Sequence, residues 1–225
     1  MLPVKDFGQA KQRLACLLGA AERRRLAHAM ADDVLATLSR VRGLSEIVVV
    51  TRDREACALA ARHGARVLAE PSNDGQSEAV TRAVAALEGS CAGGLLQVPG
   101  DVPGASADEI ETVLASHGGG RGDGRDGGPA VTLVPAHDRR GTNCVLCSPP
   151  GALPFAFGLE SFGPHCEAAR AQGIAPRIIP LPGLGLDIDT ACDLRAFIAR
   201  PVAGRTLDYL RESGIAQRLL VTDAA

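Results

Sequence analysis

Two loops near the middle of the chain contain the parts of a phosphate pocket. Residues 141–143, Gly-Thr-Asn, open an apolar run with small hydrogen-bond donors, and residues 158–161, Gly-Leu-Glu-Ser, lead into a segment, 164–173, that can form a helix. A serine directly before a helix is typical of an N-cap, and the first turn of a helix offers free N–H groups and a positive dipole to an anion. The two loops therefore predict a binding site for a phosphate group.

Three aspartates could hold a divalent metal ion. Asp187 and Asp189 lie about 6.6 Å apart along an extended chain, at roughly 3.3 Å per residue, and so on one face of it. Asp101 ends an apolar run between Pro99 and Pro103, which fix the exit of the chain from a strand. On its own such a residue is more typical of a turn or cap. Its pairing with the other two favours Mg²⁺, which takes one or two carboxylates besides water and substrate phosphates.

Basic residues gather in the first expected strand-to-helix turn. Lys5, Lys11 and Arg13 flank the flexible Gly8, and in an α/β sheet this turn faces the ligand. Cations there would neutralise a triphosphate. A solvated basic helix start explains any one of them equally well. The sequence contains neither a Walker loop nor a dinucleotide fingerprint.

A loop at residues 73–79 could hold the base or ribose of a nucleotide. Gly75 permits a close approach of the backbone, while Gln76 and Ser77 offer donors at a helix start. A simple helix cap explains this loop almost as well.

The expected reaction does not require a protein base. No Ser–His–Asp order stands out, and the five histidines are scattered. A phosphate monoester has a second pKa near 6, so at neutral pH it is already ionised and nucleophilic. Positioning, together with stabilisation of charge by metal and cations, would then carry catalysis.

Composition limits the class of protein and its partners. With 225 residues and 46% apolar content, the chain can bury one sizeable core, so we expect a single domain over residues 1–225. The net charge of −2 and the scattered basic residues argue against nucleic acid and for a small-molecule partner. No apolar run approaches the ~20 residues that span a bilayer, and the N-terminus lacks a signal-peptide core. We therefore expect a cytoplasmic protein with no membrane partner.

The cysteines do not indicate disulfides. The seven residues are scattered, and we expect them to be reduced. Cys144 and Cys147 form a CxxC pattern inside an apolar run without a second ligand pair, which favours buried core cysteines over a metal or redox pair.

The elements that must position these residues form an α/β pattern. Short β-branched runs alternate with helical patterns, which predicts a mostly parallel twisted sheet with helices on both faces. We expect strands at 4, 47–51, 66–69, 95–99, 130–134, 143–146 and 177–181, and helices at 21–38, 54–63, 77–87, 107–115, 164–173 and 192–198. Residues 118–129 should form a flexible Gly-rich loop. After residue 198 we expect one more amphipathic helix, with 215–225 as a frayed tail.

Five segments, in order, carry a resemblance to a known family: PVKDFGQAKQRL, VPGDVPG, GTNCVLC, FAFGLESF and LGLDIDTACDL. Together they resemble the 2-phospho-L-lactate and phosphoenolpyruvate guanylyltransferases of coenzyme F-420 biosynthesis, which are similar to molybdenum-cofactor guanylyltransferases. The resemblance covers residues 3–198. It implies a Rossmann-like nucleotidyltransferase fold and transfer of GMP from GTP to a three-carbon phospho-acid, with release of pyrophosphate. 2-Phospho-L-lactate, phosphoenolpyruvate and 3-phosphoglycerate are the acceptors it implies.

The resemblance also implies roles for individual residues. It implies an acceptor-phosphate site at Thr142, Gly158 and Ser161 and metal carboxylates at Asp101 and Asp187, with Asp189 adjacent, and its basic entry loop matches Lys5, Lys11 and Arg13. We therefore expect Lys11, Asp101 and Asp187 to be catalytic, Asp101, Asp187 and Asp189 to hold Mg²⁺, and Lys5, Lys11 and Arg13 to contact GTP. Further GTP contacts at Gly75, Gln76 and Ser77 are expected from the 73–79 loop itself. Two features depart from the family pattern. Its Gly-Gly-Leu-Asn base loop reads Asp-Gly-Gln-Ser here, and the first strand begins abruptly at Met1.

Three alternatives stay open from the sequence. The acceptor could be a molybdopterin or a sugar phosphate instead of a phospho-acid. The chain could also be a non-catalytic nucleotide-binding module, because a fold alone does not fix function. Finally, the chain could act alone or as a homodimer.

Overall fold

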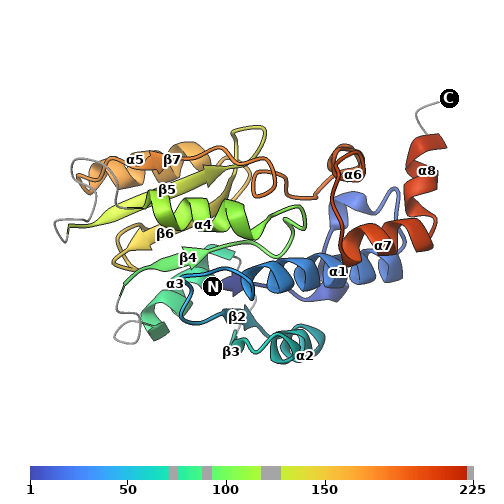
Figure 1. Ribbon diagram of the computed structural model, residues 1–225, viewed down its shortest axis with the longest axis horizontal. Coiled ribbons are helices and arrows are strands. Elements are labelled where there is room, and N and C mark those ends of the chain that lie inside the picture. Colours follow the sequence, from blue (N-terminus) through green and yellow to red (C-terminus); the bar gives the residue numbers. More distant parts are fainter. Residues whose placement is uncertain (71–75, 88–92, 118–127, 222–225) are drawn as a thin grey trace.

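The computed structural model describes residues 1–70, 76–87, 93–117 and 128–221. Gly75 and most of the 118–129 loop, for which we made predictions, lie outside these ranges. Figure 1 shows the elements in chain order, with the C-terminal helices at one end of an elongated molecule.

The strands form two hydrogen-bonded groups that Met1 joins. Parallel strands β1 (Leu2–Pro3), β2 (Val48–Thr51) and β3 (Arg66–Ala69) lie in that order. The second group has the order β4 (Leu95–Gln97), β6 (Thr142–Ser148), β5 (Ala130–Pro135) and β7 (Arg177–Ile178). The Met1 ammonium donates to the Leu96 carbonyl at 2.7 Å, and the Val98 N–H donates to the Met1 carbonyl at 3.1 Å. The first group therefore continues into the second.

One strand runs against the others. The expected parallel pairing is confirmed for β1–β2, β2–β3 and β5–β7, whereas β6 is antiparallel to both β4 and β5. Only residues 136–141 separate β5 from β6. A parallel pair needs a crossover of a dozen or more residues, so this short connection can only make a hairpin.

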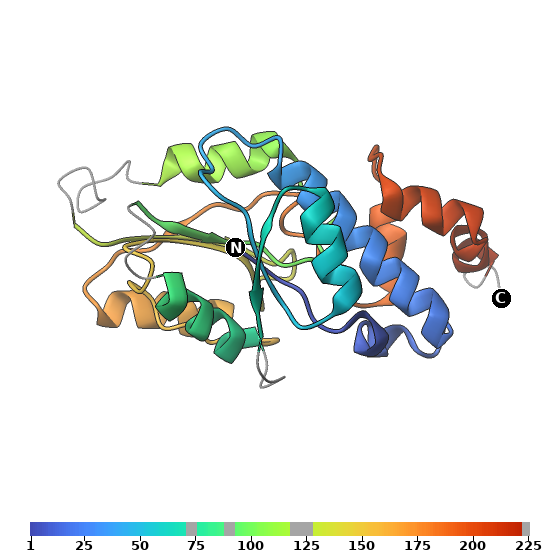
Figure 2. The same ribbon diagram turned by 90° about the horizontal axis from the view of Figure 1, so that it is seen from below.

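Helices cover both faces of the sheet, as expected. They are α1 (Ala20–Leu38), α2 (Arg54–Arg62), α3 (Gln76–Leu87), α4 (Ala107–Ser116), α5 (Phe162–Ala171), α6 (Ala191–Ile198), α7 (Arg205–Glu212) and α8 (Ile215–Val221), with short 3₁₀ turns η1 (Phe7–Gln9) and η2 (Gln12–Leu14). Figure 2 shows the strands edge-on, with α4 on one side and with α3 and α5 on the other. Three of the helices, α2, α4 and α6, begin where the sequence supplies a side-chain cap, because Asp53, Ser106 and Thr190 each accept a hydrogen bond from the first turn.

Four element predictions need correction. The first strand is Leu2–Pro3 and ends before Val4, β7 ends at Ile178 well short of residue 181, and α5 begins at Phe162. The early start of α5 is allowed because a proline in the first turn, here Pro164, lacks an N–H that would be unpaired anyway. The fourth correction concerns the frayed tail expected at 215–225, because residues Ile215–Val221 form α8.

The CxxC cysteines lie in the core, as expected. Cys144 packs in the main core and Cys147 in the cluster beneath α5, so the two side chains point to opposite faces of β6. Burial raises the pKa of both thiols to about 12. They therefore cannot act together as a metal or redox pair.

Two neighbouring leucines of α8 test whether the C-terminal helix is part of the core. Leu219 is 1% exposed and Leu220 is 68% exposed. We expect Leu219→Ala to lower the free energy of unfolding by about 2–5 kcal/mol, as for other buried leucines. The matched control Leu220→Ala should change it by less than about 0.5 kcal/mol. Urea unfolding measures both, and equal effects would mean that α8 does not pack as described.

Candidate active site

A cavity of about 700 Å³ opens at one edge of the sheet. The carboxyl ends of β1, β4 and β5 meet there. Because β6 runs the other way, its first residues reach the same edge. Among the predicted site residues, the lining includes Lys5, Lys11, Arg13, Asp101, Thr142, Gly158, Ser161, Asp187 and Asp189. The structure therefore brings the phosphate loops, the carboxylates and the basic turn into one site.

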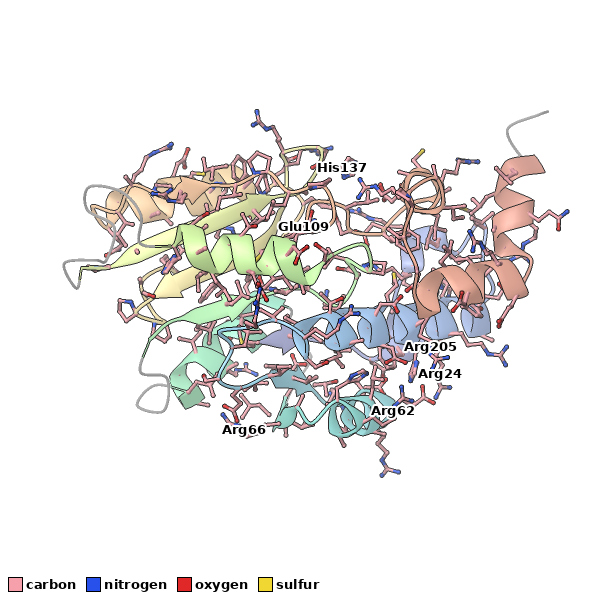
Figure 3. All side chains as sticks on the ribbon, viewed as in Figure 1. Arg24, Arg62, Arg66, Glu109, His137 and Arg205 are labelled. Atoms are coloured by element: carbon pink, nitrogen blue, oxygen red, sulfur yellow. The ribbon has the colours of Figure 1, made fainter. Side chains whose placement is uncertain are left out.

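Helix α4 positions the segment that carries Asp187. Glu109, labelled on α4 in Figure 3, accepts the N–H groups of Gly183 at 2.7 Å and Leu184 at 3.0 Å. A Cβ on Gly183 would lie 2.3 Å from both Glu109 and the Gly104 carbonyl, so only glycine permits this approach. Further along, the Ile188 N–H donates to the Asp101 carbonyl at 3.0 Å. These contacts bring the 187–189 segment beside the end of β4.

Lys11 joins two of the carboxylates. Its Nζ lies 2.6 Å from Asp101 Oδ2 and 2.8 Å from Asp189 Oδ1, with only 7% of the side chain exposed. Burial would lower the pKa of this ammonium, but Asp101 and Asp189 outweigh it and raise that pKa to about 12. Lys11 also has a left-handed backbone, φ 55°, which is uncommon for a residue with a side chain. The chain between η1 and η2 thus holds a charged lysine inside the cavity.

Asp189 is a partner of cations in this arrangement. Its Oδ1 accepts from Lys11, and its Oδ2 lies 3.5 Å from Arg13 Nη1. Burial works against the charged form, but Lys11 and then Arg13 lower the pKa of Asp189. The three-carboxylate metal set expected from the sequence is not found, since no three such side chains converge as metal ligands within the residues described.

Asp187 and Asp101 do fit a magnesium ion. Burial, and then the charge of Asp101, raise the pKa of Asp187. Asn143 Nδ2 donates to Asp187 Oδ1 at 3.1 Å, but no cation pairs with Asp187 in the part of the chain that the structure describes. Two neighbouring carboxylates, one without a cation, match the donor set that Mg²⁺ prefers.

The phosphate loops are joined to each other by hydrogen bonds. The Phe162 N–H donates to the Arg140 carbonyl at 2.9 Å, and the Thr142 N–H donates to Ser161 Oγ at 3.0 Å. Arg140 also forms an ion pair with Glu160. Ser161 precedes α5 as expected, but its hydroxyl makes no capping hydrogen bond. The Ser161 hydroxyl instead accepts the hydrogen bond that joins the two loops.

The first turn of α5 offers fewer free donors than expected. The N–H groups of Phe162 and His165 donate to the carbonyls of Arg140 and Ser161, and Pro164 has no N–H. Gly163 alone keeps an N–H without an acceptor, as far as the described residues show. Hydroxyl groups therefore matter more to this pocket than the helix N-terminus does.

Two residues that were not among the predicted site residues support the site. Asn143 binds Asp187, and His165 Nδ1 lies 2.9 Å from Thr142 Oγ1. His165 follows Ser161 by four residues, a spacing that places both on one face of a helix and could have revealed it.

The predicted nucleotide loop lies only partly within the described residues. Ser77 does not line the cavity, because its Oγ accepts the Phe157 N–H at 2.8 Å. Gln76 begins α3, and Gly75 lies outside the described ranges.

Comparisons with solved structures define the class. The chain has a TM-score of 0.74, at 16% identity, with a protein of Desulfovibrio desulfuricans G20 assigned to the nucleotide-diphospho-sugar transferases, covering 96% of this chain and 95% of that one. A nucleotidyl transferase from Methanothermobacter gives a TM-score of 0.55 at 19% identity, covering 98% and 97%. The fold is therefore that of the Rossmann-like nucleotidyltransferases.

The sequence comparisons give the family. The model of the family described as "Guanylyl transferase CofC like" matches residues 1–223. The phosphoenolpyruvate guanylyltransferase of Conexibacter woesei is 34% identical over 99% of this chain and 96% of its own. The 3-phospho-D-glycerate guanylyltransferase of Colwellia psychrerythraea is 32% identical over 90% and 92%. The chain belongs to the CofC-like guanylyl transferase family, and it is an enzyme of the guanylyltransferase class.

Proposed function

We propose that this enzyme transfers GMP from GTP to phosphoenolpyruvate and releases pyrophosphate, as a step of coenzyme F-420 biosynthesis. The observation that carries the proposal is that one cavity is lined by two hydroxyl groups, those of Thr142 and Ser161, together with Lys11, Asp101 and Asp187. The relatives from Conexibacter woesei and Roseiflexus castenholzii, 34% and 36% identical, are named phosphoenolpyruvate guanylyltransferases, which supports this acceptor.

Two groups of cavity residues bind the two substrates. On one side Thr142, Gly158 and Ser161 hold the acceptor phosphate, whose ionised oxygen attacks the α-phosphorus of GTP. A P–O bond forms to the acceptor, the bond from the α-phosphorus to the bridging oxygen breaks, and pyrophosphate leaves with that oxygen. On the other side Lys5, Lys11 and Arg13 face the triphosphate and balance its charge.

We assign Mg²⁺ to Asp101 and Asp187. The ion would supply Lewis-acid stabilisation of the charge that develops on the phosphoryl oxygens. Asp189 then serves to hold Lys11 in the cavity, so that the ammonium lies close to Asp101. Asn143 orients Asp187 through its amide.

The acceptor is tested by pyrophosphate release from GTP against phosphoenolpyruvate, 2-phospho-L-lactate and 3-phospho-D-glycerate. We expect phosphoenolpyruvate to give the highest kcat/KM. A preference for 3-phospho-D-glycerate would follow the relative from Colwellia psychrerythraea and overturn the choice of acceptor. Turnover of a molybdopterin or sugar phosphate alone, or no turnover at all, would overturn the proposed reaction.

A cytoplasmic location and the pairing of two copies stay predictions from the sequence; within the described residues, no helix is long and apolar enough to cross a membrane.

Removing either pocket hydroxyl should weaken the phospho-acid and spare the nucleotide. We expect Thr142→Val and Ser161→Ala to raise the KM for phosphoenolpyruvate by about ten- to a hundredfold, because each loses a hydrogen bond to a charged group. The KM for GTP should change far less. Ser161→Ala should also destabilise the fold by about 1–3 kcal/mol, because the buried Thr142 N–H loses its acceptor. If the GTP value rises and the acceptor value does not, the two pockets are assigned the wrong way round.

A further inference from the structure

We propose that His165 is a positioning residue for the acceptor: it donates to one lone pair of Thr142 Oγ1, so that the hydroxyl proton is not used on the ring and is free to be donated into the cavity. The inference rests on the proposed function, because it concerns how the phosphate of the acceptor is held. It adds a residue that does not line the cavity itself.

The two ring nitrogens of His165 have different partners, which determine the tautomer. Nε2 lies 3.0 Å from the backbone nitrogen of Ala156, and Nδ1 lies 2.9 Å from Thr142 Oγ1. A backbone N–H can only donate, so Nε2 must be the unprotonated nitrogen. A neutral imidazole carries its single proton on the other nitrogen, and Nδ1–H therefore donates to Thr142.

The surroundings of the ring keep it neutral. His165 is fully buried, and burial lowers its pKa to about 4. A second proton would also place an N–H against the N–H of Ala156. The ring of Phe157 packs edge-on against it, with the centroids 5.0 Å apart, and the Phe157 N–H is in turn fixed by Ser77 Oγ at 2.8 Å. The imidazole is therefore held in one orientation and one protonation state.

Both pocket hydroxyls then accept a hydrogen bond from the protein and keep their own proton for donation. Thr142 Oγ1 accepts from His165, and Ser161 Oγ accepts from the Thr142 N–H. Neither hydroxyl has an acceptor for its own proton among the residues that the structure describes, and both line the cavity. A hydroxyl has one proton to donate and two lone pairs that accept, and on each of these oxygens an internal donor already occupies one lone pair, so the unpaired proton is available to the ligand. An anion rich in acceptors and without donors, such as a phosphate dianion, is the group that such a pocket selects.

Two substitutions separate the bond to Thr142 from the bond to Ala156. The amide of an asparagine falls near the place of Nδ1, and that of a glutamine near the place of Nε2. His165→Asn therefore keeps a donor for Thr142, and His165→Gln keeps only the acceptor for Ala156. A purely structural role would make the two variants equally harmful, in proportion to their loss of thermal stability. The positioning role makes the glutamine variant the worse one for acceptor binding.

The experiment measures the KM values for phosphoenolpyruvate and GTP in both variants and in the Thr142→Val background. We expect His165→Gln to raise the acceptor KM about tenfold, with the GTP value within about twofold, and His165→Asn to stay near wild type. In Thr142→Val, His165→Gln should add no further loss, since both changes remove the same interaction. Additive losses, or equal losses in both variants, would overturn the positioning role. Absence of turnover in the unmodified enzyme would instead overturn the proposed function, and the inference with it.

Discussion

Asp187→Asn and Asp101→Asn are each expected to lower kcat by about a thousandfold at saturating GTP, phosphoenolpyruvate and Mg²⁺. Loss of a metal contact costs several kcal/mol of transition-state stabilisation. Asp138→Asn is the matched control, because this exposed carboxylate lines the same cavity but lies on the β5–β6 turn, away from Asp101. Pyrophosphate release measures all three. A wild-type kcat in either of the first two variants would show that the metal is held elsewhere.

The same Asp187→Asn change should stabilise the metal-free fold. Burial and Asp101 raise the pKa of Asp187 above its unfolded value of 3.8, so the folded state binds the proton more tightly than the unfolded state does. Stability is then lost as the pH rises through that range, and the charged carboxylate costs stability at neutral pH. Asparagine removes this cost and still accepts from Asn143. A higher Tm with a lost kcat would exclude damage to the fold; a lower Tm would contradict the assigned cause of the pKa shift.

Lys11→Met is the second large expected effect. The change leaves Asp101 and Asp189 without their shared cation, and breaking a buried ion pair costs about 3–5 kcal/mol of stability. We also expect kcat to fall by at least about a hundredfold, because the ammonium is proposed to balance the charge of the triphosphate. Urea unfolding and pyrophosphate release measure the two effects.

The pH dependence of the Lys11→Met effect has a fixed sign. The pKa of Lys11 is raised from 10.5 to about 12, so its contribution is complete below 10.5 and is lost as the pH rises through about 12. The pKa of Asp189 is lowered from 3.8, so its contribution is complete above that value and is lost as the pH falls below it. The difference in stability between wild type and variant should therefore be largest between these limits. Lys5→Met, which removes an exposed cation from the same cavity, should leave stability unchanged; an equal loss there would contradict the role of the buried pair.

The sequence predicts the layout of the fold because its strands and helices are short and clearly separated. Val48–Thr51 is a continuous β-branched run, and Asp53 and Ser106 are strong caps, so the elements fall near their predicted bounds. The direction of β6 was missed because hydrophobic pattern is the same for either direction. The short 136–141 connection does indicate the direction of β6, because it is long enough only for an antiparallel hairpin. Helix α8 was missed because its pattern is short and its stability comes from burial of Ile215 and Leu219 against distant residues.

Most of the predicted site residues line one cavity, but their pairings differ from what the sequence indicates. Phosphate donors and carboxylates follow from motifs that are local in the chain. The ion pair of Lys11 with Asp189 joins residues that the fold alone brings together, and it decides which carboxylate is left without a cation. In the same way, the role of Ser161 is set by the Thr142 N–H rather than by the helix that it precedes.

The hairpin of β5 and β6 has a consequence for how such enzymes diversify. Because β5 ends and β6 begins at the edge of the sheet where the cavity lies, one short stretch of the chain, residues 141–165, contains Thr142, Gly158, Ser161 and His165. The basic turn and the end of β4 come from earlier parts of the chain, and Asp187 from a later one. A recombination event or a few point changes inside this one stretch can therefore alter which acid is accepted while leaving the groups that handle the nucleotide in place. The proposed acceptor site is, in genetic terms, a module.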